Sequence, residues 1–327
     1  MSKYDDLVLG FGNGAGTGDG KLFVLKPTDG NGDFDVSRAS EKRVLLNGVL
    51  TLVEDNFPSM TEFGGDCPIL LTEPATDNEY VNPETLVTQD IATIADVYTV
   101  SFYGTGTIDF TGSFTGQLVG TGANERVTIT FTATAGTLTS TVTGSVTFAK
   151  AEQRSYATSY SEGSTVADSV TGAEASFNDN IGILQLDFAA LFNTGTNRSI
   201  SINDGTSDER IELRYDATND TIKGVFVAGG VGMSLSGTVA DPTVLNYAQL
   251  LWNGSYGALR INGIIVAQTD AREEPTGLTT CDFNIGFGGL PFYGYTKELN
   301  VYDTTDSFSL QFETFNAMAT FAKYDLV

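Results

Sequence analysis

The chain has 327 residues, no histidine and a formal net charge of −24. A surface this acidic repels phosphate backbones and anionic lipid, which argues against nucleic-acid binding and membrane insertion. The absence of histidine excludes Ser-His-Asp and Cys-His catalysis and every His-ligated zinc site. The length allows two β domains with a sizeable core, and the abundance of Gly and Thr favours strands joined by turns.

The first 80 residues show little hydrophobic periodicity and many turn residues. We expect residues 1–80 to form an irregular arm that gains order by packing on another surface. The arm begins without the apolar core of a signal peptide, so we expect synthesis in a cytoplasm and no classical secretion. The two cysteines, Cys67 and Cys281, are expected to be separate small hydrophobes rather than a disulfide.

Regular alternation of apolar and polar residues begins after residue 80. The apolar positions of this region are Tyr98, Val100, Phe102, Val127, Ile129, Phe131, Val146 and Phe148. Threonines lie between many of them, and glycines interrupt the runs at turn spacing. This pattern predicts a small antiparallel β-sandwich over residues 81–153. Residues 154–178 are rich in Ser, Thr, Gly and Ala and are predicted to be a linker.

A second sandwich is predicted over residues 179–303. The dipeptide Asn262-Gly263 between two apolar runs is a strong hairpin signal. Leu299 and Val301 share one face of the last strand. Residues 304–327 change to a helical period and predict a short C-terminal helix. The expected fold class is therefore all-β, with two antiparallel sandwiches after an irregular arm.

An ordered series of short motifs in the N-terminal region points to a family. The series is Pro27-Thr28-Asp29-Gly30, Asp33-Phe34, Arg38-Ala39-Ser40, Asn56-Phe57-Pro58, Cys67-Pro68 and Leu71-Thr72-Glu73-Pro74. It resembles a large family of phage-encoded virion proteins, and the run from Gly120 to Glu152 follows that family closely. The residues after Pro58 and Pro74 depart from the family's pattern, so the resemblance does not imply identical partners.

The resemblance implies a carbohydrate-binding-like jelly roll over residues 81–153. The hairpin from Ala258 to Ala267 and the closing run from Gly286 to Asp303 resemble those of concanavalin-A-like lectin modules, also called laminin-G-like. The implied function is a structural component of a virion appendage, such as a tail fibre, spike or head fibre, that attaches to the host surface. The alternatives are a decorating capsid or tail subunit with no ligand of its own, and a glycan hydrolase on the same fold.

The same resemblance suggests location and partners. We expect the protein on the virion exterior, made in the bacterial host cytoplasm. Its expected partners are other virion proteins, identical copies in a homo-oligomer with a trimer favoured, and a host-surface glycan. The residues expected to make assembly contacts are Phe34, Arg38, Pro58, Cys67, Pro68, Glu73 and Pro74.

The lectin-like fold also houses glucanases, whose active strand carries a Glu-x-Asp-x-x-Glu pattern. No Glu of this chain is followed two residues later by Asp, so we expect no enzyme activity and assign no catalytic residue. Sugar binding requires exposed aromatic rings with polar neighbours. The candidates are Trp252, Tyr256, Phe292, Tyr293 and Tyr295. Core packing is the competing interpretation of Trp252, because a lone aromatic at a strand end is usually buried.

No cofactor and no metal site are assigned from the sequence. Acidic clusters occur at Asp204, Asp208 and Glu209 and at Glu273-Glu274. Solvated loop charges are the expected interpretation. Calcium at these acidic loops is the alternative, because calcium requires only several oxygen ligands from loops.

Overall fold

The computed structural model describes residues 8–10, 34–46, 48–64, 68–174, 177–193, 197–216 and 220–302. Every regular element in these residues is a β-strand, which confirms the all-β prediction. None of the described segments is a helix with the length and apolar character needed to cross a membrane. The helix predicted for residues 304–327 lies outside the described residues.

The chain forms two compact units. Unit 1 contains residues 1–36, 69–72 and 169–327, and unit 2 contains residues 37–68 and 73–168. The predicted boundary near residue 80 therefore lies inside unit 2. The segment expected to be an irregular arm supplies strands to both units.

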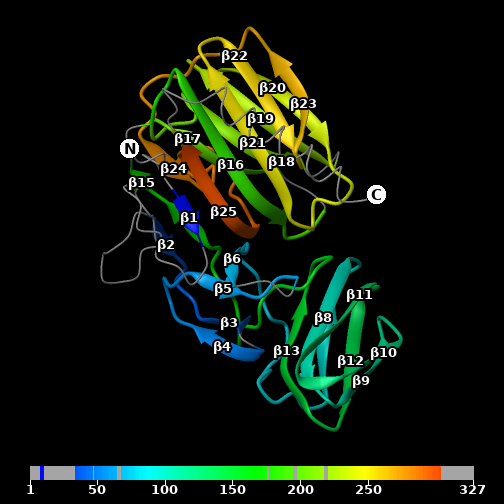
Figure 1. The fold of residues 1–327 in the computed structure, drawn as a ribbon. Coiled ribbons are helices and arrows are strands. Elements are labelled where there is room, and N and C mark those ends of the chain that lie inside the picture. The colour runs from blue at the N-terminus through cyan, green and yellow to red at the C-terminus, as the bar shows by residue number, and fades with distance from the viewer. Residues whose placement is uncertain are drawn as a thin grey trace, which may run out of the picture. The chain divides into compact units, whose positions relative to one another are not determined.

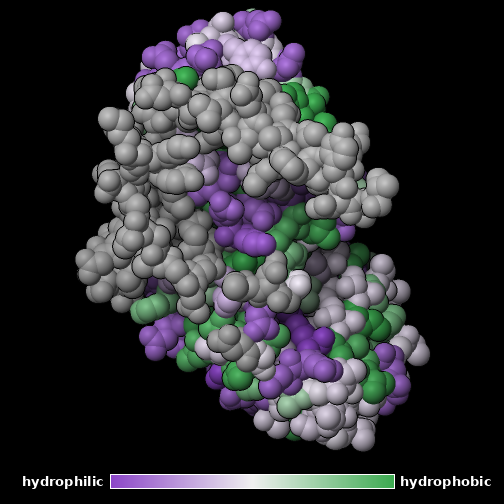
Figure 2. Space-filling view, in the orientation of Figure 1, coloured by the Kyte–Doolittle hydropathy of each residue, from purple (hydrophilic) through white to green (hydrophobic). Residues whose placement is uncertain are grey.

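Unit 2 contains two antiparallel sheets, with strand orders β10-β9-β12-β7 and β11-β8-β13 (Figure 1). A β3–β4 hairpin precedes them. The strands of this unit are β3 (Lys42–Leu46), β4 (Val49–Val53), β5 (Ser59–Thr61), β7 (Gln89–Thr93), β8 (Val97–Gly104), β9 (Thr107–Gly112), β10 (Gly116–Val119), β11 (Gly122–Thr132), β12 (Gly136–Thr143) and β13 (Val146–Glu152). On the face drawn in Figure 2, the coloured surface of this unit mixes hydrophilic, intermediate and hydrophobic residues.

The core of unit 2 follows the predicted alternation. Tyr98, Val100 and Phe102 of β8 are buried against Ile108 and Phe110 of β9. Phe131 of β11 joins the same cluster. Burial of these side chains stabilises the unit by about 2 kcal/mol each, so the sandwich follows directly from the apolar pattern.

Strand β13 departs from the predicted alternation. Its register to β8 shifts between Thr147 and Lys150, and Phe148 has a φ of +47°. After this β-bulge, Ala149 and Ala151 enter the core, and Phe148 is only half-buried. The prediction that Phe148 faces inward with Val146 is therefore wrong, because a bulge inserts one residue and reverses the phase of the strand.

The same phase reversal places charged side chains of β13 among other buried charges. Lys150 is 1% exposed, and its Nζ donates to Thr158 Oγ1 at 2.8 Å. Glu152 is also 1% exposed, and its carboxylate accepts from the Thr158 backbone N at 2.9 Å and from Thr76 Oγ1 at 2.7 Å. Buried charges are tolerated only when they are paired and hydrogen-bonded in this way.

A second set of buried charges connects distant parts of unit 2. Lys42 Nζ lies 2.8 Å from Glu73 Oε2 and 2.7 Å from Asp168 Oδ2. Arg38 donates to Asp168 Oδ1 at 3.0 Å and to Ser59 Oγ at 2.9 Å. These residues lie in segments that are far apart in sequence, so their pairing fixes the leading segment against the rest of the unit.

Unit 1 is a larger sandwich. One antiparallel sheet has the order β15-β24-β17-β18-β19-β20, and the other contains β23-β22-β21-β16-β25-β6 with β1 on β25 (Figure 1). The remaining strand bounds are β1 (Val8–Gly10), β2 (Asp35–Ser37), β6 (Ile69–Thr72), β14 (Ser169–Thr171), β15 (Ala173–Glu174), β16 (Ile181–Ala190), β17 (Arg198–Asn203), β18 (Arg210–Asp216), β19 (Thr221–Ala228), β20 (Val231–Thr238), β21 (Asn246–Asn253), β22 (Tyr256–Ile261), β23 (Ile264–Thr269), β24 (Thr280–Asp282) and β25 (Gly294–Tyr302).

The local signals of unit 1 are confirmed. Leu299 and Val301 are buried, at 0% and 2% exposed. Asn262 and Gly263 join β22 to β23 and both have positive φ, at 48° and 85°. That backbone geometry is the tight hairpin turn that Asn-Gly favours, because its twist matches the twist of the paired strands.

Replacement of Glu73 tests the buried charges of unit 2. Burial alone raises the pKa of Glu73, but Lys42, Lys150 and the hydrogen bond from Ser159 outweigh it and lower the pKa to about 2. The folded pKa is depressed, so this contribution to stability is present above pH 4.5 and is lost as the pH falls toward 2. We expect Glu73→Gln to lower the free energy of unfolding of unit 2 by about 3 kcal/mol at pH 7.

Urea unfolding between pH 2 and pH 7 measures the loss of stability in Glu73→Gln and the part of the pH dependence that is due to Glu73. Glu125→Gln, which changes an exposed carboxylate of β11, is the control and should change stability by less than about 0.5 kcal/mol. Equal stability of Glu73→Gln and Glu125→Gln at pH 7 would contradict the assignment.

Candidate functional site

The outward face of the β15–β20 sheet of unit 1 is polar. Ile200 and Ile202 of β17 and Ile211 and Leu213 of β18 are fully buried in the core. The alternate positions on β17 and β18 are Ser199, Ser201, Asn203, Arg210, Glu212 and Arg214, and the cross-strand register places them side by side on the opposite face. On β19 the same face carries Lys223 and the buried Val225 and Val227. The period of two in the sequence therefore produces a row of hydrogen-bonding groups across β17 and β18, of which Arg210 and Arg214 are half-buried and the others are fully buried.

A glycine-rich loop after β24 covers the β17 part of this face. Ser201 Oγ donates to the Asn284 carbonyl at 2.6 Å, and Ser199 N donates to the Leu290 carbonyl at 3.1 Å. At Gly286, with φ of +78°, an added Cβ would lie 2.3 Å from the Thr206 carbonyl oxygen. Only glycine fits this close approach, so the loop is fixed against the neighbouring β17–β18 turn.

Phe287 lies at the tip of this loop and is 94% exposed. Its φ is +54°, between Gly286 and Gly288, which also have positive φ. Ile285 N donates to the Gly289 carbonyl at 2.9 Å and closes the turn. The backbone is therefore ordered by its own hydrogen bonds while the ring projects into solvent.

Ion pairs dominate the polar face on β18. Glu212, which is 0% exposed, lies 2.6 Å from Arg210 Nε and 3.2 Å from Arg214 NH1. Ser199 Oγ donates to the same carboxylate at 3.3 Å. Lys223 pairs with Asp216 at the end of the row. The half-buried side chains of Arg210, Arg214 and Lys223 can donate hydrogen bonds to a hydroxyl-rich ligand, whereas Glu212 is buried within these ion pairs.

The buried polar residues at the C-terminal end of β17 are hydrogen-bonded to one another and to the backbone. Asn203 Nδ2 donates to Asp282 Oδ2 at 2.9 Å, and Asn203 Oδ1 accepts from Gly205 N at 2.8 Å. Asp282 Oδ1 accepts from Gly172 N at 2.7 Å. These side chains therefore hold the backbone that carries the loop, and they do so below the surface on which Phe287 stands.

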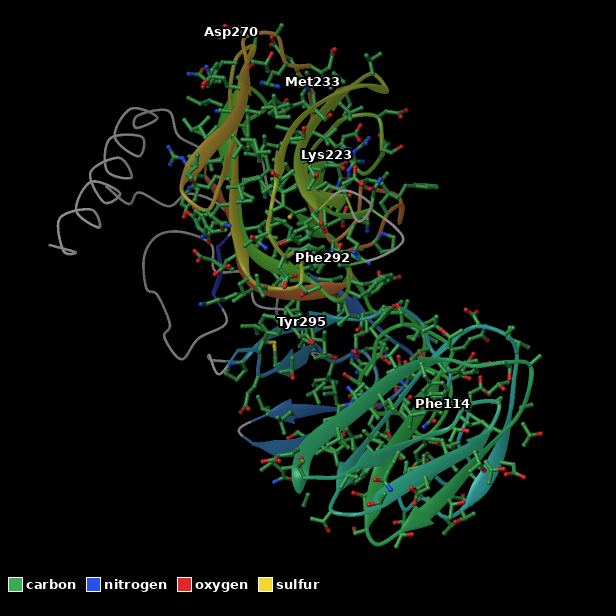
Figure 3. The ribbon with its side chains drawn as sticks, turned by 90° about the vertical axis from the view of Figure 1, so that its right-hand side faces the viewer. Phe114, Lys223, Met233, Asp270, Phe292 and Tyr295 are labelled. Carbon is green, nitrogen blue, oxygen red and sulfur yellow. The ribbon has the colours of Figure 1, made fainter. Side chains whose placement is uncertain are left out.

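Two of the aromatic residues expected to bind sugar are in the core. Trp252 is 1% exposed, and its Nε1 donates to the Asn178 carbonyl at 3.0 Å. Phe292 is 1% exposed, with its ring centroid 5.8 Å from that of Phe188 and 6.1 Å from that of Phe283 (Figure 3). A buried ring cannot stack on a sugar, so both assignments are corrected to core packing.

The other three predicted aromatic residues are half-buried, and Tyr256 on β22 is separated from Tyr293 and Tyr295 by the two intervening strands β21 and β16. The β21–β22 register puts Tyr256 on the opposite face of its sheet from Trp252. Its hydroxyl donates to Gln268 Oε1 at 3.3 Å. Tyr293 and Tyr295 lie at the start of β25. The five residues therefore do not form one surface. Phe287 has the most exposed aromatic side chain among the described residues and is not one of the predicted candidates, although the glycines on either side of it are a turn signal in the sequence.

The residues expected to make assembly contacts are partly internal. Phe34 is 0% exposed and packs edge-to-face on Phe283 at 5.6 Å. Arg38 and Glu73 belong to the buried charges of unit 2 and are 1% and 5% exposed. Buried side chains are not available to another protein, so Phe34, Arg38 and Glu73 are corrected to internal residues, and an assembly contact through the half-buried prolines stays a prediction. These prolines are Pro58, Pro68 and Pro74; Cys67 lies outside the described residues.

The acidic loops of unit 1 are engaged with their own backbone. Asp204 Oδ1 accepts from Thr206 N at 2.8 Å, and Glu209 accepts from Gly229 N at 2.6 Å and from Thr276 N at 2.9 Å. The described residues contain no group of three or more His, Cys, Asp or Glu side chains that could hold a metal ion. Cys281 is fully buried and is not in a disulfide, and burial raises the pKa of its thiol.

Comparison with known proteins gives structural similarity alone. No protein-family model matches the sequence, and no curated protein sequence matches it significantly. Several solved structures match, among them the CBM40 of a Ruminococcus gnavus IT-sialidase bound to α2,3-sialyllactose, with 17% identity and a TM-score of 0.35 over 42% of this chain and 82% of that one.

Two further solved structures are similar to part of this chain. A Bacillus licheniformis β-glucanase matches with 11% identity and a TM-score of 0.35, over 43% of this chain and 73% of that one. The Caenorhabditis elegans galectin LEC-6 matches with 12% identity and a TM-score of 0.31, over 40% of this chain and 88% of that one. Similarity of this degree says nothing about what this chain binds.

Two phenylalanines of unit 1 should respond oppositely to truncation. Phe292→Ala removes a buried ring and should lower the free energy of unfolding by about 4 kcal/mol. Phe287→Ala removes a solvent-exposed ring and should change it by less than about 0.5 kcal/mol. Thermal and urea unfolding followed by near-ultraviolet circular dichroism would compare the two variants. A large loss of stability in Phe287→Ala would mean that the ring packs on the protein in solution.

Proposed function

We propose that this protein is a structural component of a phage virion appendage and that unit 1 binds a host-surface glycan through the Phe287 loop and the polar face beside it. The virion part of the proposal is supported by the ordered N-terminal motifs and the Gly120–Glu152 run. The glycan part is supported by the geometry of unit 1. Assembly as a homo-oligomer with a trimer favoured, and a location on the exterior of the particle, are expectations that accompany it.

The observation that carries the glycan proposal is the exposure of Phe287 on an ordered turn. A ring held in solvent by glycines with positive φ loses little conformational freedom on binding, which favours affinity. Aromatic faces stack against the apolar face of a sugar ring, while adjacent polar groups bind its hydroxyls. Thr206, against which the Phe287 loop packs, and Arg210 provide such polar groups on the neighbouring turn and strand.

Binding without hydrolysis is the form of the proposal that the site chemistry favours. A glycosidase requires a protonated carboxyl as acid and a second carboxylate placed opposite it. Glu212 is instead paired with two arginines, Arg210 and Arg214. Glu212 is also fully buried, so a sugar bound on this face does not reach its carboxylate.

A glycan array probed with the full-length protein tests the glycan site. We expect Phe287→Ala to weaken binding to the recognised host-surface glycan by about tenfold or more, because the stacking face is lost, and Phe287→Tyr to retain it. Ile264→Ala, which truncates another exposed hydrophobic residue of the same unit, 69% exposed, is the matched control. Unchanged binding in Phe287→Ala would remove this loop from the site.

Immunolabelling of intact particles tests the virion part separately. Antibodies raised against unit 1 should decorate an appendage on the particle exterior in electron micrographs, because the appendage is proposed to present this unit outward. Antibodies against an unrelated host protein serve as the control. Absence of label from particles, with the protein detected only in the host lysate, would contradict the assignment as a virion component.

A further inference from the structure

Unit 2 contains a groove that the proposed function does not use. It consists of two hollows that share Glu162. The first has a volume of 280 Å³ and is lined by residues 40–43, Leu52 and residues 160–164. The second has a volume of 550 Å³ and is lined by residues 80–85 together with Glu162. We refer to these two hollows as the Tyr160 groove.

The walls of the groove are held by contacts on the bulged part of β13. Phe148 N donates to the Glu84 carbonyl at 3.2 Å, which fixes the bulge against the second hollow. The Arg43 guanidinium lies 5.1 Å above the Phe148 ring, and the Tyr160 ring meets Phe148 edge-on at 5.1 Å. Arg43 N donates to the Tyr160 carbonyl at 2.8 Å. The groove is therefore preformed by backbone and ring contacts.

The bulge itself is a strained feature of this wall. A phenylalanine with φ of +47° adopts a conformation that costs about 1–3 kcal/mol. Such strain persists only where the surrounding structure imposes it, and bulges are frequent beside binding sites because they redirect a side chain. Here the bulge directs Phe148 away from the core and toward Arg43 and Tyr160.

Tyr160 supplies a polar atom that the folded chain leaves unsatisfied. The residue is 3% exposed, and its buried hydroxyl has no hydrogen-bond partner among the described residues. Burial, followed by the charges of Glu162 and Glu84, raises the pKa of Tyr160 well above its usual value. The hydroxyl is therefore a neutral donor at physiological pH, and a buried donor without a partner costs about 1–3 kcal/mol until something accepts from it.

The charges around the groove select the ligand. Glu41, Glu84 and Glu162 are exposed at its walls. Arg43 is the cation that faces them, at 3.9 Å from Glu84, because the Lys42 ammonium is already held between Glu73 and Asp168. Carboxylates exceed cations, so an acidic ligand is repelled and a ligand with an ammonium group is favoured.

The lining also favours a hydroxyl-rich ligand. Serine hydroxyls at positions 40, 161 and 164 line the first hollow, and Leu52 and the Tyr160 ring provide its limited apolar surface. Two adjoining hollows with a shared carboxylate accommodate two successive rings. We propose that the Tyr160 groove binds a short saccharide of amino sugars, with the Tyr160 hydroxyl donating to a sugar oxygen and Glu162 accepting from groups in both hollows.

Calorimetric titration of the full-length protein at low ionic strength tests the ligand class. The probes are a glucosamine disaccharide, cellobiose as its neutral counterpart, a galacturonic acid disaccharide and the dipeptide lysyl-lysine. The glucosamine disaccharide should bind most tightly, and the galacturonic acid disaccharide should not bind. Equal or tighter binding of the acidic disaccharide or of lysyl-lysine, or no binding of the glucosamine disaccharide, overturns the proposal.

Variants locate the binding in the groove. Tyr160→Phe and Glu162→Gln should each raise the dissociation constant for the glucosamine disaccharide about tenfold. Tyr160→Phe should not lower the melting temperature, because the deleted hydroxyl has no partner in the free protein. Glu162 is exposed, so Glu162→Gln carries the test if Tyr160→Phe fails to fold. Glu125→Gln, with the same charge change elsewhere on unit 2, is the matched control.

The glycan site of unit 1 is distinguished by Phe287→Ala. That variant should bind the glucosamine disaccharide as the native protein does, even where it loses the host-surface glycan. Unchanged affinity in Glu162→Gln, or an equal loss in Glu125→Gln, overturns the groove proposal. Loss of glucosamine binding in Phe287→Ala alone also overturns it and assigns the binding to unit 1.

Discussion

The ammonium of Lys42, held between Glu73 and Asp168, is the interaction on which the organisation of unit 2 depends. All three groups are buried, and removing charges from water is costly unless each is paired and hydrogen-bonded. The pairing is therefore possible only when the segments carrying residues 42, 73 and 168 come together. Arg38 extends the same constraint to the chain around Ser59.

This ion pairing gives an internal role to residues of the segment 1–80, which the sequence predicted to be an irregular arm. Its signature residues Arg38 and Glu73 are hydrogen-bonded inside unit 2, where they hold the β3–β4 hairpin and the segment after β13. A buried set of charges specifies one arrangement of segments rather than adding much stability over an apolar core. The described residues around Arg38 and Glu73 therefore fold as part of unit 2, and these two motif positions take part in its internal pairing.

The bulge in β13 connects the core of unit 2 with its surface. By reversing the phase of the strand, it admits Ala149 and Ala151 to the core and turns Phe148 toward Arg43 and Tyr160. In unit 1 a glycine has the corresponding effect on an aromatic side chain. Gly286 allows the loop that carries Phe287 to pack against the Thr206 carbonyl. In both units a local departure from regular backbone geometry positions aromatic side chains at the candidate sites.

The sequence by itself determined the fold class, the alternation of β8 and β11 and the Asn262-Gly263 turn, because strand period and turn chemistry are local properties of the chain. It also marked the Gly-rich loop after β24. Only the tertiary structure decided that Trp252 and Phe292 are core residues, that Phe287 is exposed, and that Arg38, Lys42, Glu73 and Asp168 meet. Burial and ion pairing depend on which distant segments come together, and a bulge such as that at Phe148 follows from the fit between strands, which no local pattern records.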